Sequence, residues 1–192
     1  SVDSLSYWVF TDIFEESGAG DIPFHGGFGM VNVQGIPKPT FHTYRLLNTL
    51  GNEVLDKGDA GIITRCSESG KVAALAYHYP PEITQTIPGS FDSREPAETT
   101  LATGSPAQLD ITLEGLSAGG ELIVEILDTD NGDALSAWKK MGSPSSITRE
   151  QANALKEASA ATKLSQHNAD ASGNFALSIE IAPWSLVSVR QL

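Results

Sequence analysis

The chain has 192 residues, with 24 acidic and 12 basic side chains and a formal net charge of −12. This charge argues against a protein that binds nucleic acid, because a phosphate backbone is bound through clustered Lys and Arg. No apolar run approaches the roughly 18 residues of a membrane span, and the lone Cys66 allows no internal disulfide and leaves the compartment open.

The first predicted element is a strand over Ser4–Thr11, which contains the dense apolar and aromatic run from Tyr7 to Phe10. A run of this kind, with β-branched and aromatic members, is typical of a strand buried on both faces of a parallel sheet. Three carboxylates, at Asp12, Glu15 and Glu16, follow directly. Because the chemistry of a (β/α)8 barrel lies where its strands end, these acids are candidates for ligand contact. Alternatively, they solvate the strand end or cap a following turn.

A glycine-rich loop over residues 13–29 and a helix over residues 39–50 come next. The glycines of the loop permit positive φ or a close backbone approach, so the loop could fold over a sugar or merely turn tightly. Gly51 fits the position just past the end of this helix, which is predicted to bury one apolar face made of Phe41, Tyr44 and Leu47, with Leu50 as a further candidate.

After Gly51 the hydrophobic period changes from helical to strand-like, so a domain boundary is predicted near residues 51–59. Several short strands joined by turns indicate an antiparallel sandwich. The predicted strands cover residues 61–66, 71–79, 108–113, 121–127, 175–181 and 185–189. Residues 80–106 are expected to be a long, mobile surface connection, and residues 163–173 a polar loop.

Two helical segments interrupt these strands. Residues 134–141 are predicted to form one or two helical turns. The second helix has Thr148 as N-cap and Gln151 at the capping-box position, and it is predicted to run to about Ala161. Its inward face is expected to hold Ala152, Leu155 and Ala158 or Ser159.

Four sequence blocks together resemble a known family. The first reads Ser-Tyr-Trp-x-Phe-x-Asp-x-Phe-Glu-Glu at residues 6–16, followed by Phe-His-Gly-Gly-Phe-Gly at 24–29 and Gly-Ile-Pro-Lys-Pro at 35–39. In this order they resemble the last barrel strand, loop and helix of the family 39 glycoside hydrolases, among which the β-xylosidases are most similar. The fourth block, Asp128–Ala134 with Trp138, Met141, Gly142 and Pro144 after it, resembles the accessory region of these enzymes; Asp133 stands where the family pattern has Asn.

The resemblance implies a mainly β fold with α elements: an antiparallel β-sandwich accessory domain preceded by the last strand and helix of a (β/α)8 barrel. It assigns residues 1–51 to the end of the barrel and residues 52–192 to the sandwich, with a helical insertion at about 134–161. A complete barrel needs roughly 250 residues. We therefore expect the chain to be the C-terminal part of a retaining glycosidase, a β-xylosidase that cleaves xylo-oligosaccharides.

The resemblance also implies roles for individual residues. It places both catalytic carboxylates upstream of Ser1, so no catalytic residue is expected here and the chain alone should be inactive. Glu15 and Glu16 are expected to bind substrate by accepting hydrogen bonds from sugar hydroxyls. Trp8 is expected to offer a flat face to the sugar ring, and His25 and Phe28 to line the rim. The alternatives are a packed core aromatic for Trp8 and a loop hydrogen bond for His25.

No cofactor and no metal site are expected. In the segment Asp128–Asp133, Gly132 stands fifth and Lys139 would be twelfth, whereas an EF-hand loop needs Gly at position 6 and Glu at position 12. A turn is therefore the favoured interpretation. The four histidines form no His-x-x-x-His pair. The expected partner is a xylo-oligosaccharide or related glycoside in the parent enzyme, with no nucleic acid and no membrane.

A different class of function stays open, a stand-alone carbohydrate-binding or structural sandwich module. Its mark would be two or three exposed aromatic rings on one sheet face. Tyr77 and Tyr79 share strand parity, whereas Phe91 falls in the long connection. A barrel strand without its neighbours tends to pair elsewhere, so residues 4–14 are expected to self-associate, to dock to the missing barrel or to be buried against the sandwich.

Overall fold

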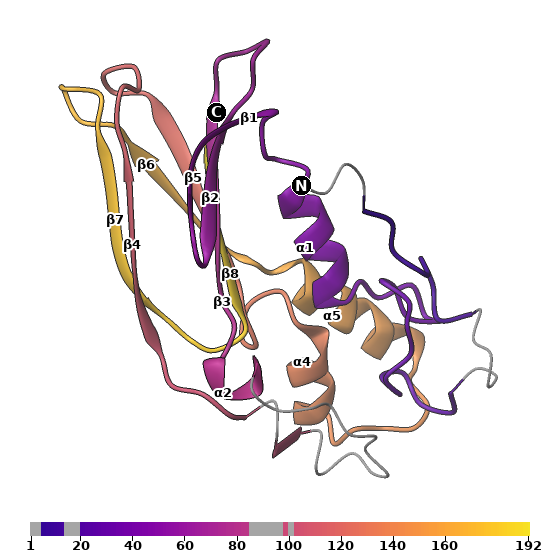
Figure 1. The fold of residues 1–192 in the computed structure, drawn as a ribbon. Helices are drawn as coiled ribbons and strands as arrows, with labels where there is room; N and C mark the ends of the chain where they lie inside the picture. Colours follow the sequence, from indigo (N-terminus) through magenta and orange to yellow (C-terminus); the bar gives the residue numbers. More distant parts are fainter. Residues whose placement is uncertain (1–4, 14–19, 85–97, 100–101) are drawn as a thin grey trace. The chain divides into compact units, whose positions relative to one another are not determined.

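The computed structural model describes residues 5–13, 20–84, 98–99 and 102–192 (Figure 1). The chain divides into two compact units. The first unit combines Ser1–Asn48 with Thr129–Lys163, and the second combines Thr49–Asp128 with Leu164–Leu192. In the described residues, no helix is both long enough and apolar enough to cross a membrane.

The second unit contains two β-sheets. The larger has six strands in the order β1-β2-β3-β8-β5-β6, and the smaller pairs β4 with β7. The register is antiparallel for β1–β2, β2–β3, β3–β8, β5–β8 and β4–β7. The strand bounds are β1 Glu53–Gly58, β2 Gly61–Arg65, β3 Val72–His78, β4 Ala107–Leu113, β5 Glu121–Leu127, β6 Lys163–Asn168, β7 Phe175–Ile181 and β8 Ser185–Gln191; the short helix α2 is Pro81–Thr84.

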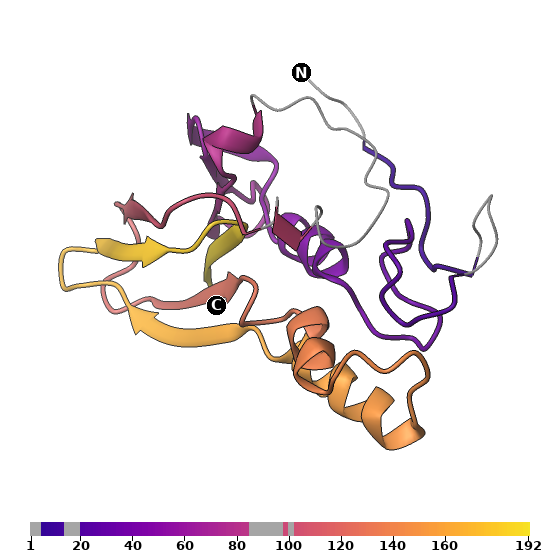
Figure 2. The same ribbon diagram turned by 90° about the horizontal axis from the view of Figure 1, so that it is seen from below.

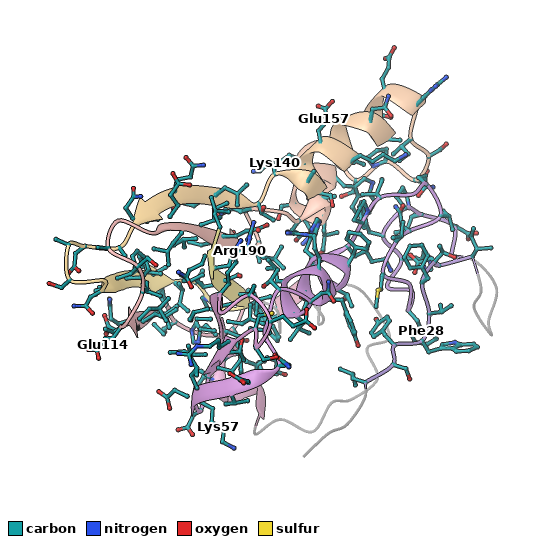
Figure 3. All side chains as sticks on the ribbon, turned by 90° about the horizontal axis from the view of Figure 1, so that it is seen from above. Phe28, Lys57, Glu114, Lys140, Glu157 and Arg190 are labelled. Carbon is teal, nitrogen blue, oxygen red and sulfur yellow. The ribbon has the colours of Figure 1, made fainter. Side chains whose placement is uncertain are left out.

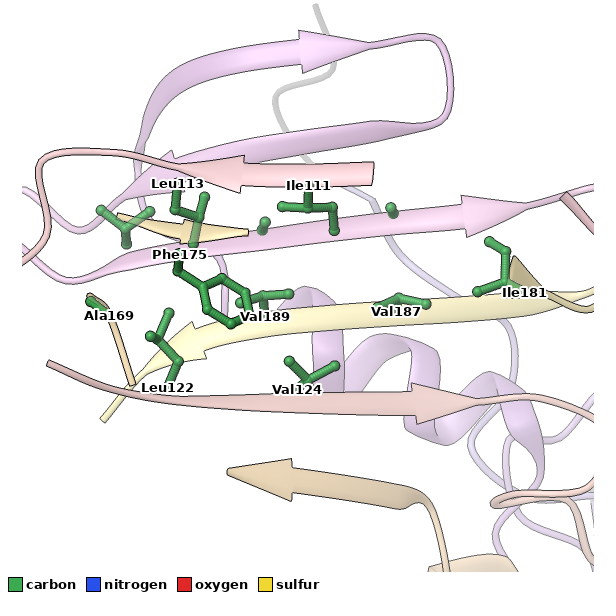
Figure 4. Close-up of a cluster of buried hydrophobic side chains, with 12 residues drawn as sticks. Ile111, Leu113, Leu122, Val124, Ala169, Phe175, Ile181, Val187 and Val189 are labelled. Carbon is green, nitrogen blue, oxygen red and sulfur yellow. The ribbon is translucent and has the colours of Figure 1, made fainter. Parts of the chain in front are cut away.

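The two sheets share one hydrophobic core (Figure 4). Alternate residues of β3, β5 and β8 face alternate residues of β4 and β7, as the period of two along a strand requires. Leu122, Val187 and Val189 are fully buried there, and each such side chain contributes about 1.5–3 kcal/mol of hydrophobic free energy. The opposite face of the large sheet carries a partly buried ion pair, in which Arg190 Nη1 donates to the buried Glu125 Oε2 at 3.0 Å.

Where the structure describes the first unit, it contains three helices, α1 Pro39–Leu47, α4 Ala134–Lys140 and α5 Arg149–Ala160. α4 and α5 lie side by side, as the orange ribbons of Figure 2 show. Their buried core consists of Ile36, Ala134, Trp138 and Leu155. The Trp138 indole is fully buried and satisfies its N–H by donating to the Pro144 carbonyl at 3.0 Å.

A chain of polar groups connects α1 to α5. Ser159 Oγ donates to the Pro37 carbonyl at 2.8 Å and lies 3.1 Å from His42 Nε2. Because the serine hydrogen points to Pro37, the imidazole N–H is the donor in the second bond. His42 and Ser159 are both buried, and this pairing removes much of the cost of burying them.

Most of the predicted elements are confirmed. The six predicted strands correspond to β2, β3, β4, β5, β7 and β8, and the helical segments to α4 and α5. The capping box of Thr148 and Gln151 is present, and Leu155 and Ser159 are the buried residues of α5. The fold is therefore mixed α and β with mostly antiparallel sheets. The division into residues 1–51 and 52–192 stays a prediction.

The prediction for α1 was partly wrong. The helix ends at Leu47, and its buried residues are His42 and Leu46 rather than the predicted apolar face. The imidazole could be buried because Ser159 gives it a partner, which the hydrophobic pattern cannot indicate. Gly51 does not end the helix. It lies against the backbone of Arg65, where a side chain would collide.

Two strands were missed. β1 was not predicted, and β6 lies in the predicted polar loop. Both are edge strands of the large sheet, and almost all their residues are exposed. Their side chains need not alternate between core and solvent, so the sequence shows no strand period. Apart from α2, residues 98–99 and residues 102–106, the predicted long connection lies outside the described residues.

Candidate functional site

The N-terminal stretch is not a buried strand in the part that the structure describes, residues 5–11. Its backbone is held on one side, where Val9 and Phe10 carbonyls accept from the Met30 and Val31 amides at 3.1 and 3.0 Å. Thr11 forms an isolated parallel bridge to Val31. Its large side chains are exposed, most strongly Leu5, Trp8 and Phe10, and Ile13 just after it is exposed as well. The Met30–Val31 segment provides hydrogen-bond donors to this backbone but leaves the large side chains exposed.

Asp12, in contrast, is completely buried. Its Oδ1 accepts from Lys38 Nζ at 2.7 Å and from the Gly29 amide at 2.7 Å. Lys38 Nζ also donates to the Gly27 carbonyl at 2.8 Å. These bonds join the end of the apolar stretch, the glycine-rich loop and the residue before α1. A buried carboxylate requires such compensation, so Asp12 anchors the loop.

His25 lies beside this anchor. Its Nε2 is 3.9 Å from Asp12 Oδ2, and its side chain is 12% exposed. The ring also packs against Gly20, where any side chain would collide with it. The arrangement places His25 mostly inside the loop, with a small part of its surface exposed. Whether it contacts a sugar stays a prediction.

Phe28 and Trp8 have accessible rings, 56% and 68% exposed. Phe28, labelled in Figure 3, belongs to the glycine-rich loop. The bond from the Met30 amide to the Val9 carbonyl brings together the two short stretches that carry these residues. Trp8 is not packed in a core within this chain, and its role in the whole enzyme stays a prediction. The predicted acids Glu15 and Glu16 lie outside the described residues.

Sequence reasoning missed Lys38 as a member of this cluster. Lys38 stands between two prolines, Pro37 and Pro39, and precedes α1 as its N-cap. The sequence signal that could have found it is the Gly-Ile-Pro-Lys-Pro block at residues 35–39, which places a cation in a rigid turn.

The acidic segment Asp128–Asp133 leads into α4 and provides its N-cap. Asp133 is the N-cap, and its Oδ1 accepts from the Leu135 amide at 2.9 Å. Burial raises the pKa of the Asp133 carboxyl, while the Leu135 hydrogen bond and Lys139 act in the opposite direction. Within the described residues, no group of three or more His, Cys, Asp or Glu side chains is placed to hold a metal ion.

Comparison with known sequences connects these features to a family. The sequence model described as "Glycosyl hydrolases family 39" matches residues 1–176. A "Beta-xylosidase" of Caldicellulosiruptor saccharolyticus is 34% identical over 154 residues, which is 80% of this chain and 29% of the relative. A "Beta-xylosidase" of Geobacillus stearothermophilus is 31% identical over 157 residues, 82% of this chain and 27% of the relative. The chain thus spans less than a third of the length of either relative.

Solved structures give a consistent result. The GH39 enzyme from Xanthomonas axonopodis pv. citri superposes with a TM-score of 0.79 and 26% identity, over 99% of this chain and 37% of that one. A monomeric β-xylosidase from Caulobacter crescentus CB15 superposes with a TM-score of 0.76 and 28% identity, over 99% of this chain and 38% of that one.

Proposed function

The chain belongs to glycosyl hydrolase family 39, and from this premise we propose that it is the C-terminal part of a retaining β-xylosidase that cleaves xylo-oligosaccharides. The observation that carries the proposal is the match of residues 1–176 to the family. The chain covers 29% of the "Beta-xylosidase" of Caldicellulosiruptor saccharolyticus. The rest of the enzyme, including its catalytic pair, would come from the remaining length.

In this proposal residues 1–51 supply the last strand, loop and helix of the barrel. The hydrogen bonds of Val9 and Phe10 to the Met30 and Val31 amides and the parallel bridge at Thr11 support this, because the strands of a barrel pair with parallel neighbours. The exposed rings near Trp8 would be covered by the rest of the barrel or, without it, by a second copy of the chain. Residues 52–192 form the accessory sandwich, which the shared core of two antiparallel sheets supports.

The chemistry is divided between the two parts of the enzyme. A retaining glycosidase uses two carboxyl groups about 5–5.5 Å apart, one as nucleophile and one as acid and base. This chain contributes the wall of the sugar site. Glu15 and Glu16 accept hydrogen bonds from sugar hydroxyls, and Trp8 and Phe28 give flat apolar surfaces for the ring.

The buried cluster explains how this wall keeps its shape. Asp12 directly precedes the segment that contains Glu15 and Glu16, and its carboxylate is bound to Lys38 and to the Gly29 amide. The start of that segment and the residue after Phe28 therefore share one anchor. Sites held by buried hydrogen-bonded groups orient substrate more precisely than unsupported loops.

A chimera tests the residue assignments. This chain would replace the matched portion of the Caldicellulosiruptor enzyme, and hydrolysis of an aryl β-xyloside would be measured. We expect Glu15→Ala or Glu16→Ala to lower kcat/KM by well over tenfold, and Trp8→Ala to raise KM. Lys57→Ala, on the exposed strand β1, is the matched control and should change neither constant. If neither glutamate substitution has an effect beyond tenfold, the assignment is wrong.

A further inference from the structure

Trp184 has an unusual backbone for a large residue. It stands in the turn between β7 and β8 with φ of 65°. Its amide donates to the His78 carbonyl at 2.7 Å, which holds the turn in place. The left-handed region favours glycine, and a bulky side chain there is a true outlier that directs attention to function.

The ring of Trp184 meets the ring of Tyr79. The register pairs His78 with Ser185, so Tyr79 and Trp184 lie opposite each other one position beyond β3 and before β8. Their ring centroids are 4.8 Å apart and their planes meet at 83°. We call this pair the aromatic corner. Tyr79 is 42% exposed, and Trp184 is half-buried.

Close packing holds the aromatic corner in place, and a polar group lies beside it. Gly104 packs closely against Pro80 and Pro183, the neighbours of the two rings in sequence. Tyr77, two residues before Tyr79, is 47% exposed, and its hydroxyl donates to the Asp59 carbonyl at 3.1 Å. This bond orients the phenol, and a tyrosine oxygen that donates can also accept a hydrogen bond. The surface is therefore preformed, which lowers the entropic cost of binding.

We propose that the aromatic corner, with Tyr77 beside it, is a binding surface for a neutral β-linked pyranose polymer. One face of a pyranose ring presents C–H bonds that pack on aromatic rings, and its rim presents hydroxyls for groups such as the Tyr77 oxygen. The net charge of −12 disfavours a polyanion. The choice of ligand class rests on the proposed function, because an enzyme that cleaves xylo-oligosaccharides benefits when the parent polymer is held near it.

The left-handed backbone gives a clean experiment. Trp184→Gly removes the ring at a position where glycine is the preferred residue. The relief of backbone strain offsets part of the packing that is lost with the half-buried ring, so the variant should remain folded, which its melting curve checks. The full chain would be run in native gels that contain soluble xylan or mixed-linkage β-glucan. We expect xylan to retard the chain, Trp184→Gly and Tyr79→Ala each to weaken the dissociation constant by about tenfold or more, and Trp184→Phe to retain part of the binding. Leu164→Ala, an exposed apolar residue on β6, is the control and should bind as the unmodified chain does.

Two results would overturn the inference. One is a chain that neither polymer retards. The other is retardation that persists in Trp184→Gly and Tyr79→Ala but is lost in the double variant Trp8→Ala, Phe28→Ala, which would place polymer binding on the proposed catalytic wall. Neither result touches the hydrolysis measured with the chimera. Equally, an inactive chimera would refute the proposed function, whereas binding of the polymer at the aromatic corner would still be decided by the gel measurements.

Discussion

Lys38→Met should destabilise the cluster around Asp12 more than the other single substitutions there. The Lys38 side chain is 15% exposed and that of Asp12 is fully buried, and Lys38 Nζ lies 2.7 Å from Asp12 Oδ1. Methionine keeps the length of the side chain but leaves the Asp12 carboxylate with the Gly29 amide as its remaining hydrogen-bond donor of those described. Breaking a buried pair in this way costs about 3–5 kcal/mol. Asp12→Asn leaves a cation that can reach solvent and should cost about 1–3 kcal/mol.

Amide hydrogen exchange localises this effect. The Met30 and Val31 amides donate to Val9 and Phe10 and report the opening of this segment. A loss of about 3 kcal/mol accelerates their exchange by more than about 100-fold. The double variant should cost less than the sum of the two single ones, because it leaves no unpaired charge. Lys57→Met on exposed β1 is the matched control. Exchange at Met30 and Val31 that changes less than about fivefold in Lys38→Met would refute the reasoning.

Two further substitutions test the N-cap of α4 and the hydrogen bond of the buried Trp138. Asp133→Asn retains the N-cap and removes the charge whose burial raises the pKa of the Asp133 carboxyl. It should raise the melting temperature at pH 7, and the gain should vanish as the pH falls through the folded and then the unfolded pKa of the native carboxyl, since a raised folded pKa stabilises the fold at low pH; an equal gain at pH 3 and pH 7 would contradict the assigned cause. Trp138→Phe removes the indole donor and leaves the Pro144 carbonyl without that bond. It should destabilise the chain by about 1–3 kcal/mol beyond any loss of packing, as measured by denaturant unfolding, and a cost below about 0.5 kcal/mol would show that the bond contributes little.

Strands that bury one face could be predicted from the sequence. β3, β4, β5, β7 and β8 alternate or concentrate apolar residues because the two sheets share one core. The turn at residues 67–70 followed from Gly70, whose φ is 73°. β1 and β6 lie at the sheet edges with exposed side chains, so hydrogen bonding alone defines them. Such strands have no hydrophobic signature.

The candidate site was predictable in part. The motif blocks pointed to Trp8 and Phe28, whose rings are exposed in this chain, and their binding role stays a prediction. The sequence placed Asp12 together with Glu15 and Glu16 as acids that follow an apolar run. It could not distinguish the buried anchor from the others, because the partner Lys38 is 26 residues away. The ring of Trp184 likewise meets Tyr79 through strand pairing between β3 and β8.

The measurement that tests the central claim most directly is the initial rate of aryl β-xyloside hydrolysis by the chimera described above. It would be compared with the rates of this chain alone and of the remaining part of the Caldicellulosiruptor enzyme alone. If this chain completes a family 39 β-xylosidase, the chimera hydrolyses the xyloside at least about 100-fold faster than either part, a gain of about 2.7 kcal/mol in transition-state stabilisation. A folded chimera no faster than its separate parts would contradict that account.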